Sequence, residues 1–172
     1  MPNQNIYNDP LFFKGYSRLR WGETGLNKVM EEPAIRSLMP DLTGKRVLDL
    51  GCGFGHVARY ARQMGAAKVL GVDISDRMIE AARQATEDQA VTYSVIAMQD
   101  IKPMPRQFDV VISSMALHYI DDYAAVVKTI AESLTLGGSF LFSIEHPIYT
   151  SLLQGWVVDD TGKRVHWPGP LP

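Results

Sequence analysis

Three glycines at alternate positions, Gly51, Gly53 and Gly55, follow an aspartate at the end of a short apolar run, RVLDLGCGFG. Glycine lets a strand turn sharply and lets a ligand approach the backbone, because it has no Cβ. If a helix follows at once, its first backbone N–H groups point at the same place and attract an anion. Residues 46–55 are therefore a candidate cofactor-binding turn.

A strand, a glycine turn and a helix together serve two classes of cofactor. Dinucleotide-binding folds use G-x-G-x-x-G, in which the third glycine permits close packing of the helix. This chain has G-x-G-x-G, with Ala58 further on and Asp49 two positions before the first glycine. A carboxylate at this place suits a ligand that carries an amino group and repels a pyrophosphate.

Four histidines, His56, His118, His146 and His166, are dispersed without the spacing of a metal site, so no metal is predicted. His118 follows the apolar run 110–113 and His146 follows the run 139–144, which places both at the ligand end of a parallel sheet. They are candidates for a general base or for substrate binding, as is Glu145. Hydrogen-bonded loop histidines with a structural role are the alternative. His56 is expected on the surface, in the first turn of a helix.

Five apolar runs must position these residues, and each is predicted as a strand. They are Val47–Leu50, Val69–Asp73, Val91–Ala97, Val110–Ser113 and Ser139–Ile144. Near-continuous Val, Ile and Leu indicate burial on both faces, which is typical of a parallel sheet covered by helices. Helices are predicted at His56–Met64, from Asp76 to about Thr86 with Ser75 as N-cap, and at Tyr123–Leu134, stopped by Gly137 and Gly138. The fold class is α/β, a doubly wound sheet with helices on both faces.

The segments outside this core predict a single domain with two additions. Residues 1–40 form a helical cap or lid, 41–147 the core, and 148–172 a C-terminal hairpin or tail around 156–158 and 164–167. Pro33 interrupts a helix-like pattern over 26–38, which predicts two short helices. The aromatic rings near the N-terminus, from Tyr7 to Tyr16, either pack on the domain or close a ligand pocket.

Composition narrows the function classes. The chain has 172 residues and a net charge of −2, with no basic block, which argues against binding along a nucleic-acid backbone. Cys52 is the single cysteine, which excludes an internal disulfide and suits a reducing compartment. The sequence shows no signal peptide and no apolar run near the ~20 residues of a membrane span. We therefore expect a cytoplasmic protein with no membrane partner.

Four ordered motifs resemble those of the class I S-adenosylmethionine-dependent methyltransferases. DLGCGFG is similar to their motif I, D/E-x-G-x-G-x-G, and VLGVDIS to their second motif, with an acid at the end of strand two. FDVVISSMALHYI resembles the fourth-strand motif, and LTLGGSFLFSIEHP the glycine pair and fifth strand. The likeness covers about residues 40–147 and is nearest to the small-molecule branch called methyltransferase type 11. It implies a Rossmann-like, mostly parallel sheet of order 3-2-1-4-5, S-adenosylmethionine as cofactor with S-adenosylhomocysteine as product, and a small-molecule acceptor.

The resemblance also implies a role for each matching residue. Asp49 would face the ammonium group of the cofactor, the turn from Gly51 through Cys52 and Gly53 to Gly55 would bring backbone N–H groups to its carboxylate, and Asp73 would take the ribose hydroxyls. Ile74 and Met78 would flank the adenine. The edge of the adenine would be bound by Gln99, Asp100 and Ile101, with Asp100 preferred for the exocyclic amine. The residues beneath the sulfonium would be Ser113, Ser114 and Met115. Candidates on the substrate side are Tyr16, His118, Tyr119, Glu145 and His146.

The chain departs from the family pattern after the fifth strand. Family members usually continue with a helix and strands six and seven, and the residues after Ile144 do not show that pattern. The edge of strand five would then be exposed, which favours association. Either the chain is a shortened form, or a partner chain or a homodimer covers the edge. Two other functions stay open: a non-catalytic S-adenosylmethionine-binding or scaffold protein, and an NAD-dependent oxidoreductase.

Overall fold

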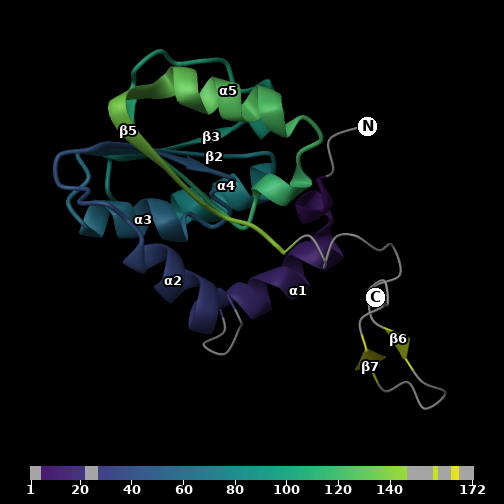
Figure 1. The fold of residues 1–172 in the computed structure, drawn as a ribbon. Coiled ribbons are helices and arrows are strands. Elements are labelled where there is room, and N and C mark those ends of the chain that lie inside the picture. The colour runs from purple at the N-terminus through teal and green to yellow at the C-terminus, as the bar shows by residue number, and fades with distance from the viewer. Residues whose placement is uncertain (1–4, 22–26, 147–156, 159–163, 167–172) are drawn as a thin grey trace.

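The fold is built on a five-stranded parallel sheet with the order β3-β2-β1-β4-β5 (Figure 1). A computed structural model describes residues 5–21, 27–146, 157–158 and 164–166, with side chains described over 5–17 and 28–146. The strands are β1 (Arg46–Leu50), β2 (Lys68–Asp73), β3 (Val91–Val95), β4 (Phe108–Ser114) and β5 (Leu134–Ser143). The predicted Rossmann-like α/β class and strand order are confirmed.

Helices cover both faces of this sheet, with α5 on the side opposite α2 and α3 (Figure 1). The α-helices are α1 (Pro10–Trp21), α2 (Glu32–Ser37), α3 (His56–Gln63), α4 (Asp76–Gln84) and α5 (Tyr123–Ser133). Shorter turns are η1 (Ile6–Asn8), the π-helical η2 (Asn27–Glu31), η3 (Met98–Asp100) and η4 (Leu117–Tyr119). The predicted pair of short helices is η2 and α2, with Pro33 in the first turn of α2. Ser75 caps α4 as predicted and accepts a hydrogen bond from the Met78 amide at 3.2 Å.

The core lies on the two faces of the sheet because side chains along a strand alternate between them. Val47 of β1 packs in one cluster with Ala58 of α3 and Ile79 of α4. Its neighbour Leu48 packs in the other cluster with Ile130 of α5. The central strands β1 and β4 are therefore buried and apolar over consecutive positions, at Val47 and Leu48 and from Val110 to Ile112.

The start of β5 differs from the prediction. The predicted helix ran to Leu134 and ended at the glycine pair, but α5 ends at Ser133 and Leu134 already pairs with Phe108 of β4. The register then shifts before Ser139 pairs with Val110, and Gly137 in this stretch has a φ of 76°. The glycines therefore serve an irregularity within the strand rather than the end of a helix.

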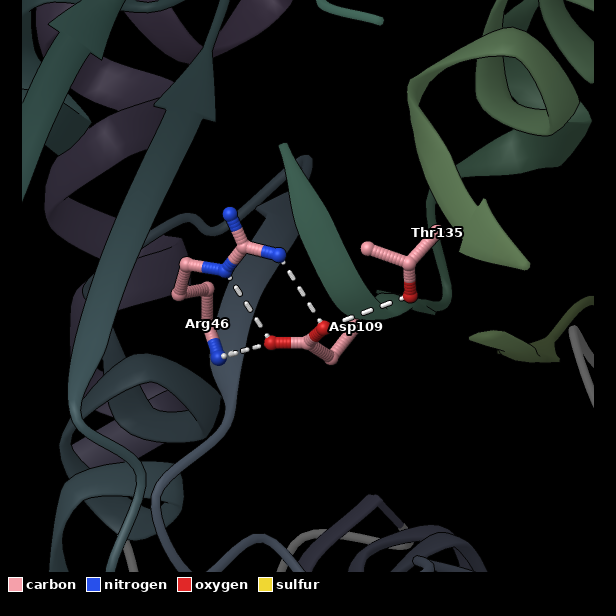
Figure 2. A network of polar contacts seen from close by, with 3 residues as sticks. All are labelled: Arg46, Asp109 and Thr135. Carbon is pink, nitrogen blue, oxygen red and sulfur yellow. Dashed lines mark hydrogen bonds and ion pairs between the residues drawn. The ribbon is translucent and has the colours of Figure 1, made fainter. Parts of the chain in front are cut away.

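At the amino end of the sheet, a network of one ion pair and several hydrogen bonds joins β1, β4 and β5 (Figure 2). The Arg46 guanidinium donates two hydrogen bonds of 3.1 Å to the Asp109 carboxylate, and the Arg46 backbone N–H donates a third of 2.9 Å. The Thr135 hydroxyl of β5 also contacts Asp109, at 3.2 Å. These hydrogen bonds lower the pKa of Asp109 to about 2. The network fixes the end of the sheet that is remote from the candidate site.

The remaining described residues form a small antiparallel pair, β6 (Val157–Val158) with β7 (Arg164–His166), in a sheet of its own. This agrees with the predicted hairpin, whose connecting residues 159–163 and flanking residues Trp156 and Trp167 lie outside the described residues. Within the described residues, no strand pairs with the outer edge of β5. It stays a prediction that a partner covers this edge. The division of the chain into a cap (1–40), a core (41–147) and a tail (148–172) also stays a prediction. No described helix has the length and apolar character needed to cross a membrane.

Candidate functional site

A pocket of about 970 Å³, its open mouth included, lies beyond the carboxyl ends of β1, β2, β3 and β4. This is where a doubly wound sheet places its ligands. The pocket brings together most of the predicted cofactor residues: Asp49, Gly51, Cys52, Gly53, Asp73, Ile74, Met78, Gln99, Ser114 and Met115. Two substrate candidates, Tyr16 and Tyr119, also line it.

Asp49 of β1 supplies a buried carboxylate to the pocket. It is 1% exposed, and its Oδ2 atom is buried with no hydrogen-bond partner among the described residues. Burial and, to a smaller extent, the charge of Asp73 raise the pKa of Asp49 to about 7, against a hydrogen bond from the Ala58 amide that lowers it. An unpaired buried carboxylate oxygen is costly unless a donor or a cation meets it. Asp49 therefore suits a cationic ligand group.

Asp73, the last residue of β2, provides a second acid on the same wall. Its Oδ2 accepts a hydrogen bond from the Gly53 amide and its Oδ1 one from the Ser75 amide, both at 2.9 Å. Burial raises the pKa of Asp73, while these backbone hydrogen bonds lower it. The side chain thus ties the glycine turn to the end of β2 and keeps a carboxylate at the pocket.

The amides of the glycine turn donate within the fold. The N–H groups of Gly51 and Cys52 both donate to the Val72 carbonyl, at 2.8 and 2.9 Å, and Gly55 donates to the Cys52 carbonyl at 2.8 Å. With Gly53 bound to Asp73, the expectation that these amides face a ligand carboxylate does not fit this structure. Instead, His56 and Val57 in the first turn of α3 line the pocket, at the positive end of that helix.

The glycines are needed for the shape of the turn. Gly51 has a φ of 72°, and a Cβ there would collide with the side chain of Ala116. Gly55 also has a positive φ, and a Cβ there would collide with Tyr93 in the core. Gly55 is not among the residues that line the pocket, and its predicted contact with the cofactor stays a prediction.

Three other predicted cofactor residues do not line the pocket either. Ser113 is fully buried and donates to the Leu50 carbonyl at 3.0 Å, because alternation along β4 turns its side chain away from the face that Ser114 reaches. Ile101 packs in the core, and Asp100 is exposed. Gln99, one residue earlier in η3, lines the pocket, while the predicted contact of Asp100 with the adenine stays a prediction.

Cys52 is on the pocket but is not primed as a nucleophile. Burial raises the pKa of its thiol well above the ordinary value, and Asp49 and Asp73 raise it further. A thiol with a raised pKa carries little thiolate, the reactive form. Cys52 therefore contributes surface to the pocket wall.

His118, Glu145 and His146 do not line the pocket. His118 lies in η4 with its ring 4.3 Å from that of Tyr119, and burial lowers its pKa while Glu145 opposes this. Their predicted roles stay predictions. Among the described residues, no group of three or more His, Cys, Asp and Glu side chains could hold a metal ion.

Sequence reasoning missed several lining residues, mostly apolar or aromatic. They are Tyr7, Phe54, His56, Val57, Ile96, Met98, Ala116 and Ile120. The aromatic N-terminal segment was the available signal for Tyr7, whose hydroxyl is 2.9 Å from that of Tyr119. Tyr16 stacks on Phe54, with ring centroids 6.2 Å apart. The N-terminal rings therefore pack on the domain, as predicted, and Tyr7 and Tyr16 also line the pocket. That this segment closes the pocket as a lid stays a prediction.

Comparisons with known proteins give the family. Residues 48–142, more than half of the chain, match the type 11 family model described as "Methyltransferase domain". An uncharacterized protein of Haemophilus influenzae is 36% identical over 169 residues, which cover 94% of this chain and 66% of that protein. A ubiquinone biosynthesis O-methyltransferase of Neisseria meningitidis is 37% identical over 107 residues, 60% of this chain and 45% of that enzyme.

A solved structure agrees with these matches. The crystal structure of an S-adenosylmethionine-dependent methyltransferase from Mesorhizobium loti is 42% identical with a TM-score of 0.74, covering 84% of this chain and 66% of that one. The chain spans about two thirds of the length of this protein and of the Haemophilus relative, and less than half of the Neisseria enzyme. From the family match and these relatives, the chain belongs to the type 11 methyltransferase domain family.

Proposed function

We propose that this protein transfers a methyl group from S-adenosylmethionine to a small-molecule acceptor. The observation that carries the proposal is the buried, unpartnered Oδ2 of Asp49, beside the glycine turn. S-adenosylmethionine supplies an electrophilic methyl on a sulfonium and also bears an ammonium group. A fully buried carboxylate oxygen is the partner that such an ammonium group needs.

The charge of the pocket separates this ligand from a dinucleotide. Asp49 and Asp73 place two acids on one wall, and burial raises the pKa of both. A bound cation would stabilise these buried carboxylates in their charged form, whereas a bound pyrophosphate would add negative charge beside them and repel them. The pocket therefore fits S-adenosylmethionine better than NAD.

The remaining assignments come from the lining residues. Asp73 would take the ribose hydroxyls, Ile74 and Met78 would flank the adenine, and Gln99 would meet its edge. Ser114 and Met115 would lie beneath the sulfonium, and the first turn of α3 would face the carboxylate. These residues orient the reactants and exclude water, which is most of the catalytic task for an activated methyl donor.

Three features support a small-molecule acceptor. The net charge is −2 and the sequence has no block of Lys or Arg, which argues against binding along a nucleic-acid backbone. The N-terminal rings of Tyr7 and Tyr16, with Tyr119, line the pocket and suit an apolar or aromatic partner. The Neisseria relative is named for O-methylation in ubiquinone biosynthesis, which is chemistry on a small molecule.

The test is a methyl-transfer screen. The protein is incubated with S-adenosylmethionine labelled on its methyl group and a panel of phenols, alcohols, amines, thiols and carboxylic acids. The proposal predicts label in at least one acceptor and stoichiometric S-adenosylhomocysteine, with D109N, remote from the pocket, as active as the wild type. Binding of the cofactor without transfer to any acceptor would favour a non-catalytic S-adenosylmethionine-binding protein.

A further inference from the structure

Glu31, the last residue of η2, brings a carboxylate from the N-terminal segment to the carboxyl ends of two strands. Its Oε1 atom accepts hydrogen bonds from Ser114 at the end of β4, at 2.7 Å, and from Ser143 at the end of β5, at 2.6 Å. The two serines are 83 and 112 positions from Glu31 in sequence. Two hydroxyl donors on one carboxylate oxygen fix the orientation of the whole group.

The other oxygen of this carboxylate is left open. Glu31 Oε2 is buried and has no hydrogen-bond partner among the described residues, and the ion pairs found there do not include Glu31. An ionised carboxylate can accept about four hydrogen bonds, and a buried oxygen without one is costly. The side chain is thus held in place by one oxygen and presents the second without a partner.

This carboxylate is adjacent to the pocket. Ser114, which donates to Glu31, is part of the pocket wall, so a single hydrogen bond links the Glu31 carboxylate to a residue that lines the pocket. The next residue, Met115, also lines the pocket and has a φ of 51°, rare for a residue with a side chain. Its backbone N–H donates to Ser143 Oγ at 3.1 Å and to the Ser143 carbonyl at 3.0 Å. Backbone strain of this kind collects at ligand sites.

We propose that Glu31 selects the acceptor: its Oε2 accepts a hydrogen bond from an O–H or N–H group of the molecule to be methylated. The inference rests on the proposed methyl transfer and assigns the acceptor side of the same site. The two serines hold Oε1 so that Oε2 has a fixed direction, which is how a carboxylate positions a donor group. Glu31 thereby favours acceptors that carry a donor hydrogen over the same molecules with that hydrogen replaced by methyl.

The test compares E31Q with E32Q. Glutamine keeps the shape of the side chain and an oxygen for the two serines, but replaces the second oxygen by an N–H donor. Glu32 is the next residue and pairs with Arg36 at 3.0 Å, away from the serines, so E32Q is a matched control. Ligand-observed NMR titrations of the S-adenosylhomocysteine-saturated proteins use two probe pairs: phenol against anisole, and benzylamine against benzyltrimethylammonium.

The proposal predicts that the wild type and E32Q bind phenol or benzylamine better than the methylated counterpart. E31Q should lose roughly ten- to hundredfold in affinity for the preferred donor while its affinity for S-adenosylhomocysteine is unchanged. S143A, which removes one of the two donors that fix Oε1, should lose less, and it carries the test if E31Q does not fold. The phenol pair and the benzylamine pair together distinguish a hydroxyl acceptor from an amine acceptor.

Three results would overturn the proposal. The first is equal binding of the donor and methylated probes by the wild type. The second is an E31Q protein that still prefers the donor probe as the wild type does. The third is an equal loss of cofactor and probe binding in E31Q with a lowered Tm, which would make Glu31 only a structural link. If S-adenosylhomocysteine does not bind at all, the proposed function fails instead. The probe series on the protein alone then still tests Glu31.

Discussion

The substitution Asp49→Asn should weaken binding of S-adenosylmethionine and, in the same protein, stabilise the ligand-free state at neutral pH. Asparagine keeps the shape of the side chain but removes the buried charge. The two effects have opposite signs because the charge is unfavourable in the empty fold and favourable beside a bound ammonium group. A purely structural role for Asp49 would not give this combination.

The stability effect results from the raised pKa. Burial moves the pKa of Asp49 from 3.8 to about 7 in the folded protein, so the folded state binds the proton more tightly than the unfolded chain. The contribution of Asp49 to stability is fully present below about pH 4 and is lost as the pH rises through 7. The full loss is of order 4 kcal/mol, from about 1.4 kcal/mol per pKa unit. The free energy of unfolding of D49N should not show this loss.

The binding effect results from the same pKa. One pH unit below 7, roughly a tenth of the Asp49 carboxyls are ionised, and one unit above, roughly nine tenths. Affinity for S-adenosylmethionine should therefore rise roughly tenfold, or about 1.4 kcal/mol, between about pH 6 and pH 8. D49N should bind more weakly at about pH 8 and lack this rise.

Isothermal titration calorimetry at the two pH values, with urea unfolding of the ligand-free proteins, measures both effects. D109N is the control, since Asp109 is remote from the pocket and its pKa of about 2 keeps it from titrating in this range. It should keep the rise in affinity of the wild type. The reasoning fails if wild-type affinity is flat across this range, or if D49N keeps both its affinity and the rise.

Other substitutions test the remaining parts of the structure. Gly51→Ala and Gly44→Ala both force alanine into a positive φ of 72°, at about 1–2 kcal/mol, but nothing lies within 4 Å of the added carbon at Gly44. Urea unfolding should therefore show G51A less stable than G44A by about a further 1–3 kcal/mol, and equal losses would contradict the predicted collision. D109N should be less stable than the wild type at neutral pH, and this difference in the free energy of unfolding should disappear as the pH falls from about 4 through 2. The reason is that Asp109, whose pKa is lowered by its pair with Arg46, stabilises the fold only while its carboxylate is ionised. A difference that persists at acid pH would refute this. Phe54→Ala removes the ring on which the N-terminal aromatic residues pack, and it should lower the free energy of unfolding by about 3 kcal/mol or more. Limited proteolysis should then cleave the N-terminal segment faster. Unchanged cleavage would show that this segment does not depend on the ring.

The sheet and the glycine turn could be predicted because their signals are local. Val47 and Leu48 point to opposite faces and both are buried, so an apolar run marked each strand. Asp49 and Asp73 end two such strands, and the ends of neighbouring parallel strands meet at one edge. Both acids therefore line the pocket that the sequence indicated.

Tertiary contacts decide the features that the sequence did not predict. Leu134 continues a helical pattern, yet its pairing with Phe108 draws it into β5. Whether Gln99 or Asp100 faces the pocket depends on rotation within a three-residue turn, which spacing alone does not fix. Glu31 gave no signal, because its partners Ser114 and Ser143 are distant in sequence.

The central claim is that the pocket beside the glycine turn binds S-adenosylmethionine. Calorimetric titration of the wild-type protein with S-adenosylmethionine, S-adenosylhomocysteine and NAD, at about pH 8 where Asp49 is ionised, tests it most directly. We predict saturable binding of the first two at one site per chain and no binding of NAD. Binding of NAD without binding of S-adenosylmethionine would contradict the claim.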